Sequence, residues 1–127
     1  MKKILVLIMI SFIFLTGCGT KKEQLSYQEI SASEAKSMID ENNDLLILDV
    51  RTKLEYNEGH LKDAINIEHT SISNKISNVT KDLEKTIIIY CRSGARALVA
   101  AQALIDLGYK NVYTFGGINS WDYEIVD

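Results

Sequence analysis

Apolar runs alternate with amphipathic stretches along most of this chain. Residues 45–50 and 86–90 are continuous apolar runs rich in leucine and isoleucine, which is typical of strands buried on both faces of a parallel sheet. Residues 97–107 are rich in alanine and leucine and apolar almost all round, which predicts a helix packed on that sheet and ended by Gly108. The chain is therefore organised around a strand, a tight loop and a helix between residues 86 and 107.

Shorter segments continue the alternation of strands and helices. Ser31 and Glu34 have the spacing of a capping box, which predicts the start of a helix. The remaining predicted strands cover residues 27–30, 64–67 and 111–115, and the remaining helical segments cover residues 31–40, 51–58, 71–78 and 118–123. Strands that alternate with helices imply an α/β protein, with a parallel sheet covered by helices on both faces. In such a sheet, ligands bind beyond the carboxyl ends of the strands.

The N-terminal residues do not fit this pattern. Lys2 and Lys3 precede an apolar run over residues 4–15, which is shorter than the about 20 residues of a membrane-spanning helix. The run ends in Leu-Thr-Gly-Cys. This ending resembles a bacterial lipoprotein signal; an ordinary secretory signal and an uncleaved anchor are the alternatives. The resemblance implies cleavage after residue 17 and a lipid on Cys18.

Cleavage before Cys18 divides the chain into a signal peptide (1–17), the lipidated cysteine with a tether (18–26) and one domain (27–127). Because two or more acyl chains give stable attachment, we expect the protein on the extracytoplasmic face of a bacterial membrane. Loss of two lysines with the signal lowers the basic count from 14 to 12 against 17 acidic side chains, a formal charge of −5. This balance argues against nucleic acid as a partner.

Cys91 is the one cysteine besides Cys18, so a lipidated Cys18 leaves no disulfide within the domain. A free thiol outside the cytoplasm is liable to oxidation, so its presence there indicates that the thiol has a function. Cys91 directly follows the apolar run 86–90 and precedes the predicted helix. Backbone N–H groups at a helix start bind anions, and the helix dipole with Arg92 and Arg96 favours a thiolate. The loop therefore predicts a nucleophilic thiolate that receives part of an anionic substrate; an inert core cysteine is the alternative.

All three arginines of the chain lie near two predicted strand ends, although the chain contains eleven lysines. Arg51 follows the run 45–50, which carries Asp49, and the other two flank the loop after Cys91. Because the carboxyl ends of parallel strands share one edge, the two segments are expected to meet. Arginine is suited to planar, multidentate contacts with anions. For Arg51, an ion pair with Asp49 or Glu55 is the favoured interpretation.

These motifs resemble the rhodanese domain. Residues 49–61 (Asp-Val-Arg-Thr-Lys-Leu-Glu-Tyr-Asn-Glu-Gly-His-Leu) are similar to the family pattern D-x-R-x-x-x-E-[FY]-x-x-G-H-[IL]. Residues 91–96 (Cys-Arg-Ser-Gly-Ala-Arg) are similar to its C-R-S-G-x-R active loop, and residues 108–121 resemble its C-terminal pattern. The resemblance covers roughly residues 27–127, the whole predicted domain.

The resemblance implies a three-layer rhodanese-like fold, with a five-stranded parallel sheet flanked by helices, and sulfurtransferase chemistry in which the catalytic Cys91 carries a persulfide. Asp49 and Arg51 are expected to support the loop. The substrate-binding residues it implies are Arg92, Ser93, Gly94, Ala95, Arg96 and Ala97. It implies no organic cofactor and no metal, and as partners small sulfur-containing anions or persulfides of proteins and small thiols. We expect a monomer.

One departure from the family pattern bears on activity. Ala97 stands where serine is common, so a hydroxyl that could bond the persulfide is missing. Asp63, in place of a frequent glycine, lies in a predicted surface turn and matters little.

Two other functions remain as alternatives. Phosphatases and arsenate reductases of the same architecture use C-x5-R, a loop one residue longer than the six residues from Cys91 to Arg96. The shorter loop suits a sulfur atom better than a tetrahedral oxyanion. A non-catalytic or redox-sensing module on the cell surface is the alternative from another class.

Overall fold

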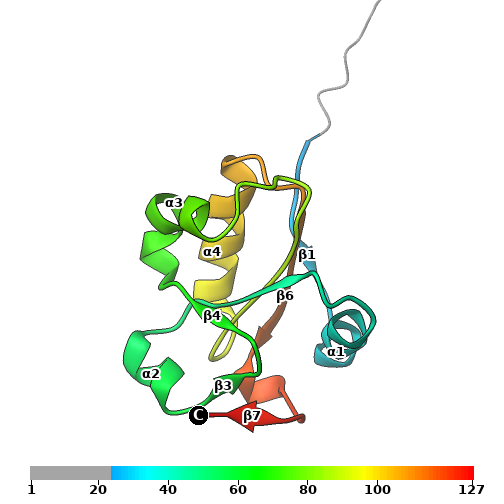
Figure 1. The fold of residues 1–127 in the computed structure, drawn as a ribbon, viewed down its shortest axis with the longest axis vertical. Helices are drawn as coiled ribbons and strands as arrows, with labels where there is room; N and C mark the ends of the chain where they lie inside the picture. Colours follow the sequence, from blue (N-terminus) through cyan, green and yellow to red (C-terminus); the bar gives the residue numbers. More distant parts are fainter. Residues whose placement is uncertain (1–23) are drawn as a thin grey trace, which may run out of the picture.

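The computed structural model describes residues 24–127 (Figure 1). The predicted signal peptide, Cys18 and most of the tether lie outside the described residues. None of the helices within residues 24–127 combines the length and the hydrophobicity of a membrane-spanning segment.

A five-stranded parallel sheet forms the centre of the domain, as predicted. Its spatial order is β1-β6-β5-β2-β4, with parallel pairing throughout. The strands are β1 (Gln28–Glu29), β2 (Leu46–Asp49), β4 (Ile65–Asn66), β5 (Thr86–Cys91) and β6 (Asn111–Gly117). The two apolar runs become the neighbouring strands β2 and β5, because only strands covered on both faces bury continuous apolar sequence.

Helices cover both faces of this sheet. They are α1 (Ala32–Glu41), α2 (Lys53–Asn57), α3 (Ile72–Lys75) and α4 (Ala95–Asp106), with 3₁₀ turns at His69–Ser71, Ile76–Asn78 and Ile118–Ser120. Figure 1 shows α1 on one side of the sheet and α3 with α4 on the other. The layers are therefore helix, sheet and helix. The predicted capping box of α1 is confirmed: Glu34 N donates to Ser31 Oγ at 3.1 Å, and Ser31 N donates to Glu34 Oε2 at 3.0 Å.

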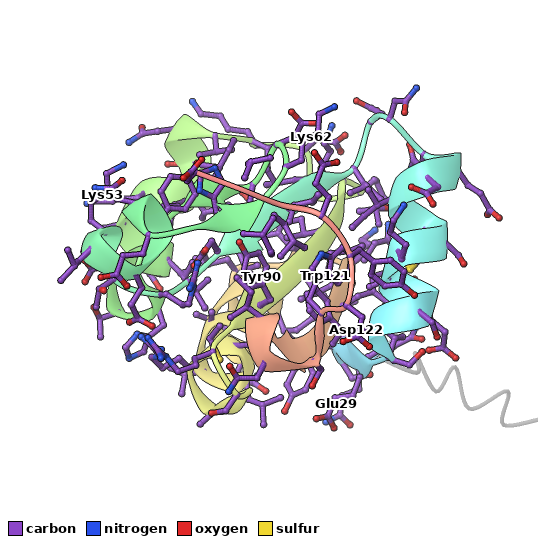
Figure 2. All side chains as sticks on the ribbon, turned by 90° about the horizontal axis from the view of Figure 1, so that it is seen from below. Glu29, Lys53, Lys62, Tyr90, Trp121 and Asp122 are labelled. Carbon is purple, nitrogen blue, oxygen red and sulfur yellow. The ribbon has the colours of Figure 1, made fainter. Side chains whose placement is uncertain are left out.

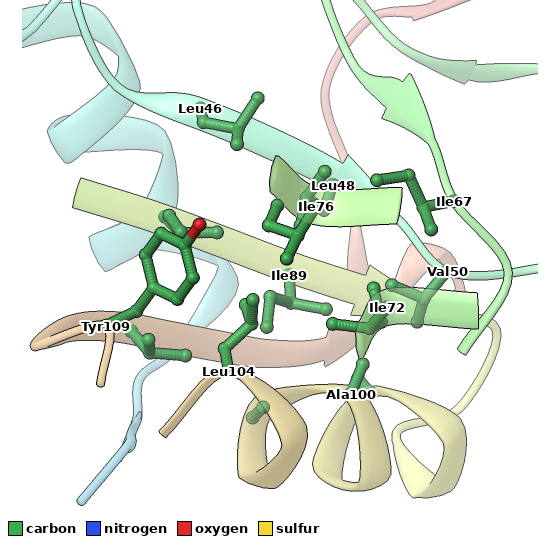
Figure 3. Packing of buried hydrophobic residues seen from close by; sticks show 14 of the residues in the cluster. Leu46, Leu48, Val50, Ile67, Ile72, Ile76, Ile89, Ala100, Leu104 and Tyr109 are labelled. Atoms are coloured by element: carbon green, nitrogen blue, oxygen red, sulfur yellow. The ribbon is translucent and has the colours of Figure 1, made fainter. Parts of the chain in front are cut away.

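Alternate residues of β5 enter two separate cores. Ile88 and Tyr90 pack on the α1 side in one cluster with Phe115, and the partly buried Trp121 packs against this cluster (Figure 2). Ile87, Ile89 and Cys91 pack on the side of α3 and α4, the core drawn in Figure 3. The period of two along the strand thus turns Cys91 toward α4 and Tyr90 away from it.

The structure corrects several predicted boundaries. Helix α4 begins at Ala95 and not at residue 97, because Gly94 takes a φ of 128° at its N-cap. Strand β6 continues through Gly117, whereas it was predicted to end at residue 115. The helix predicted over residues 71–78 is one turn of α-helix between 3₁₀ turns.

A second, two-stranded sheet was missing from the prediction. It pairs β3 (His60–Leu61) with β7 (Ile125–Val126) in antiparallel fashion. The pairing ties the C-terminal end of the described chain to the segment after α2. Strands of two residues are too short to show the alternating pattern by which a strand is predicted.

Candidate active site

Cys91 is the last residue of β5 and is 1% exposed. Its sulfur is held by the loop that follows: the backbone N–H of Gly94 donates to Sγ at 3.0 Å. On the other side the thiol donates to the carbonyl oxygen of Gly116 at 3.6 Å. The prediction that Cys91 leads from a central strand into a loop at a helix start is confirmed.

The loop closes within three residues because Gly94 adopts a left-handed backbone conformation, with a φ of 128°. Leu98 N donates to Gly94 O at 3.1 Å and forms the first turn of α4. The N–H groups of Ala95, Arg96 and Ala97 lie in this first turn, where a helix offers them no acceptor. These groups, with the helix dipole, create a positive potential beside Cys91 that suits an anion.

Gly117 at the end of strand β6 packs directly against the backbone of the loop after Cys91. A Cβ on this residue would lie 2.1 Å from the carbonyl oxygen of Arg92, so no other amino acid fits without moving the loop. Asn119 N donates to the same carbonyl at 3.2 Å. The sequence prediction ended this strand at residue 115 and missed the role of Gly117, although the paired glycines at 116 and 117 were an available signal.

Arg92 and Arg96 both bind Glu55 of helix α2. Arg92 donates to Glu55 Oε2 from Nε at 3.2 Å and from Nη2 at 3.1 Å. Arg96 donates from Nη1 to Oε1 at 2.7 Å and from Nη2 to Oε2 at 3.0 Å. Glu55 was expected as a partner of Arg51; the structure pairs it with the two loop arginines instead. The guanidinium groups of Arg92 and Arg96, predicted to bind the substrate, are therefore engaged by this carboxylate.

The contacts of Glu55 keep it ionised. The Arg96 guanidinium, helped by Arg92 and Thr52 and opposed by partial burial, holds the pKa of Glu55 well below its usual range. Thr52 and Glu55 also form a capping box at the start of α2. Their spacing in the sequence was a signal for this box, and it fixes the carboxylate opposite the loop.

Asp49 and Arg51 form a buried ion pair, which confirms the interpretation preferred for Arg51. Arg51 Nη2 donates to Asp49 Oδ2 at 2.7 Å and to the carbonyl oxygen of Gly59 at 2.6 Å. Asp49 is 0% and Arg51 5% exposed. The pair thereby holds the turn after α2 in place, and that turn leads into β3.

Tyr90 completes this buried network, and sequence reasoning missed it. Its hydroxyl donates to Asp49 Oδ2 at 2.7 Å and accepts from Leu61 N at 3.0 Å. Burial, followed by the Asp49 charge and its hydrogen bond, raises the pKa of Tyr90 well above its usual value. A single tyrosine in an aliphatic strand was the available signal, since a buried hydroxyl requires a partner. The network lies on the face of the sheet opposite to Cys91, so it supports the site through the backbone of β2 and β5.

The other predicted loop residues fall into two groups. The side chains of Ser93, within the loop, and Ala95, the first residue of α4, are exposed. Ala97 is 0% exposed and packs in the same core as Cys91, so this residue offers the loop its N–H and not its side chain.

Comparisons with known proteins agree with this geometry. The family model of the rhodanese-like domain matches residues 31–124. A putative sulfurtransferase of Bacillus subtilis is 33% identical over 100 residues, which cover 79% of this chain and 95% of that protein. A thiosulfate sulfurtransferase of Coxiella burnetii is 31% identical over 98 residues, which cover 76% of this chain and 89% of that protein.

Solved structures show the same fold. A protein of Staphylococcus saprophyticus superposes with a TM-score of 0.69 at 28% identity, covering 79% of this chain and 99% of that one. A rhodanese of E. coli solved with anions gives a TM-score of 0.61 at 28% identity, covering 65% of this chain and 96% of that one. Since the family model and these relatives span nearly all of the described domain around Cys91, the chain belongs to the rhodanese-like sulfurtransferase family.

Proposed function

We propose that the protein transfers sulfane sulfur from thiosulfate or a persulfide donor to a thiophilic acceptor through a persulfide on Cys91. The observation that carries the proposal is the position of the Cys91 sulfur, 3.0 Å from the Gly94 N–H at the start of α4. A thiolate here meets the backbone donors of a helix start, which stabilise an anionic sulfur without a metal or an organic cofactor.

The reaction proceeds in two displacements. The Cys91 thiolate attacks the outer sulfur of thiosulfate, the S–S bond of thiosulfate breaks, and sulfite leaves with the bonding electron pair. Cys91 then carries a persulfide anion. An acceptor such as cyanide or a thiolate attacks the terminal sulfur of this persulfide, and the electron pair of the broken S–S bond returns to Cys91 as thiolate. Each step balances in charge, since one anion enters and one anion leaves.

The test measures thiocyanate formation from thiosulfate and cyanide, with mass spectrometry of the protein after thiosulfate alone. We expect turnover and a mass increase of one sulfur atom on the peptide that contains Cys91. A Cys91→Ser variant of the same protein serves as the control and should show neither. Turnover by that variant, or no sulfur on Cys91 in a folded protein, would contradict the proposal and favour a non-catalytic or redox-sensing role.

An aryl phosphate and arsenate in the same assay address the phosphatase and arsenate reductase alternatives. The six residues from Cys91 to Arg96 form a smaller cradle than the loops of those enzymes. We expect no significant hydrolysis of the phosphate and no reduction of arsenate. Efficient turnover of either would assign the loop to oxyanion chemistry.

We further propose that Cys18 carries a lipid that anchors the domain to the extracytoplasmic face of a bacterial membrane. The proposal rests on the basic start, the apolar run and the Leu-Thr-Gly-Cys ending at Cys18. Cells fed radiolabelled palmitate should incorporate it into the protein, and Cys18→Ala should abolish the label. Release of unlabelled wild-type protein into the medium would contradict the anchor.

A further inference from the structure

Glu55 occupies both loop arginines, the side chains that an anionic donor would contact. Its carboxylate accepts two hydrogen bonds from Arg92, at 3.2 and 3.1 Å, and two from Arg96, at 2.7 and 3.0 Å. Within residues 24–127, no other carboxylate forms an ion pair with either arginine. A donor that binds through these guanidinium groups must share them with Glu55 or displace it.

The carboxylate is held firmly in this place. Thr52 donates to Glu55 Oε1 from its backbone N at 3.4 Å and from Oγ1 at 3.1 Å, while Glu55 N donates to Thr52 Oγ1 at 3.2 Å. The Glu55 side chain is 16% exposed, against 28% for Arg96 and 56% for Arg92. The fixed member of the trio is therefore the negative one, and the most exposed member is Arg92.

The formal charges of the side chains at the loop cancel when Cys91 is a thiolate. The positive charges of Arg92 and Arg96 are balanced by Glu55 and by the reactive sulfur. Thiosulfate brings two negative charges to this neutral site, whereas a thiosulfonate brings one. A dianion gains less from arginines that a carboxylate already neutralises, and it is repelled twice as strongly by that carboxylate.

We propose that Glu55 sets the donor preference of the site, against dianionic donors such as thiosulfate and toward donors that carry one negative charge, such as thiosulfonates and persulfides. Glu55 acts through the arginines and is a positioning residue. The inference rests on the proposed sulfur transfer. With a thiosulfonate, the Cys91 thiolate bonds to the outer sulfur, the S–S bond of the donor breaks, and a sulfinate leaves with the electron pair. A persulfide anion remains on Cys91, so charge and atoms balance.

The test compares thiosulfate with methanethiosulfonate, in which a methyl group replaces one charged oxygen. Both donors are assayed with cyanide as acceptor on wild-type protein and Glu55→Gln, because glutamine preserves the capping box. We expect kcat/KM of the variant for thiosulfate to rise about tenfold, mainly through a lower KM. For methanethiosulfonate the rise should be about threefold or less, because the removed repulsion scales with the charge of the donor.

Two further variants separate charge from structure. Glu58→Gln removes one negative charge just after the C-terminal end of α2, from an exposed side chain with no hydrogen bond to either arginine, and it should leave the ratio of the two donors unchanged. Glu55→Asp retains the charge and should retain the wild-type ratio even if both rates fall. If Glu55→Gln does not fold, salt dependence of the wild-type protein gives an independent measurement. A neutral site predicts that kcat/KM for thiosulfate does not fall as ionic strength rises.

The outcomes distinguish this inference from the proposed function. Equal changes for both donors in Glu55→Gln, or a loss of kcat at unchanged KM, would overturn the role of Glu55 alone. A steep fall of thiosulfate turnover with salt would do the same, because it indicates a positive site. Turnover of neither donor by the wild-type protein would overturn the proposed function, and this inference with it.

Discussion

Gly117 lies so close to Arg92 that a Cβ on the glycine would be 2.1 Å from the Arg92 carbonyl oxygen. The end of β6 and the loop after Cys91 are thus in contact through their backbones. We expect Gly117→Ala to displace the loop and lower kcat/KM more than tenfold, with a loss of about 1–3 kcal/mol in the free energy of unfolding, as for other overpacked sites. Steady-state kinetics and urea denaturation measure both effects.

Gly108→Ala is the matched control for this change. Gly108 also has a positive φ, of 96°, but its Cβ would meet only a Leu83 side-chain atom at 3.6 Å, and it lies at the far end of α4. We expect a loss of about 1–2 kcal/mol in stability, because alanine is strained in the left-handed region, without a loss of activity per folded molecule. Full activity of Gly117→Ala would show that the loop tolerates movement.

The proposed sulfur transfer depends on the thiol of Cys91. We expect Cys91→Ser to abolish sulfur transfer, because an alcohol does not form a persulfide, while the serine remains small enough for the buried position. The thermal unfolding midpoint measures whether the fold persists. A folded Cys91→Ser protein with wild-type turnover would falsify the mechanism.

Arg92 and Arg96 should respond differently to truncation. Arg96 is half as exposed as Arg92 and contacts both oxygens of Glu55, so Arg96→Ala should lower stability as well as activity. Arg92→Ala should act mainly on binding of anionic donors, with a loss on the order of 1.5–3 kcal/mol, the range for a lost charge-assisted bond. That loss is roughly tenfold to a hundredfold in kcat/KM.

Kinetics with thiosulfate and an uncharged polysulfide, together with thermal midpoints, measure this difference. The activity loss of both variants should shrink with the uncharged donor. Equal losses with both donors would show that the arginines do not contact the anionic end of the donor.

Tyr90 should contribute to stability and not to turnover. In Tyr90→Phe, Asp49 loses a hydrogen bond and the Leu61 N–H is left without its acceptor in the interior. A buried unsatisfied group costs about 1–3 kcal/mol, which urea denaturation measures as a lower midpoint. Tyr113→Phe is the control, because the Tyr113 hydroxyl makes no hydrogen bond within residues 24–127. A similar midpoint for both variants would be evidence against the network.

Through Glu55, the free energy of unfolding should depend on pH in acidic solution. Its folded pKa is depressed, so its contribution is fully present above the unfolded value of about 4.3 and is lost as pH falls toward the folded pKa. The difference in free energy of unfolding between wild type and Glu55→Gln should be constant above about pH 5 and shrink in more acidic solution. Glu58→Gln, which removes a charge that contacts neither arginine, corrects for net charge. A difference that does not change with pH would contradict the depressed pKa.

The sequence by itself determined the α/β architecture of this protein. The aliphatic runs that became β2 and β5 require cover on both faces, so a parallel sheet between helices follows from hydrophobic pattern alone. Cys91 at the end of one run, followed by a glycine and an alanine-rich helix, placed the thiol at a helix start. The pairing of Asp49 with Arg51 is local, two residues apart, and could also be predicted.

Only the tertiary structure decided which polar groups pair across long distances in the sequence. Glu55 meets Arg92 and Arg96 from 37 and 41 residues away, and Tyr90 meets Asp49 from 41 residues away. Gly117 meets the Arg92 carbonyl only because β6 lies beside β5. Local pattern reports which face of an element is buried, whereas the choice of a polar partner depends on strand order and helix placement. Those are fixed by the packing of the whole chain, because a buried charge or hydroxyl is stable only where the completed fold brings it a partner.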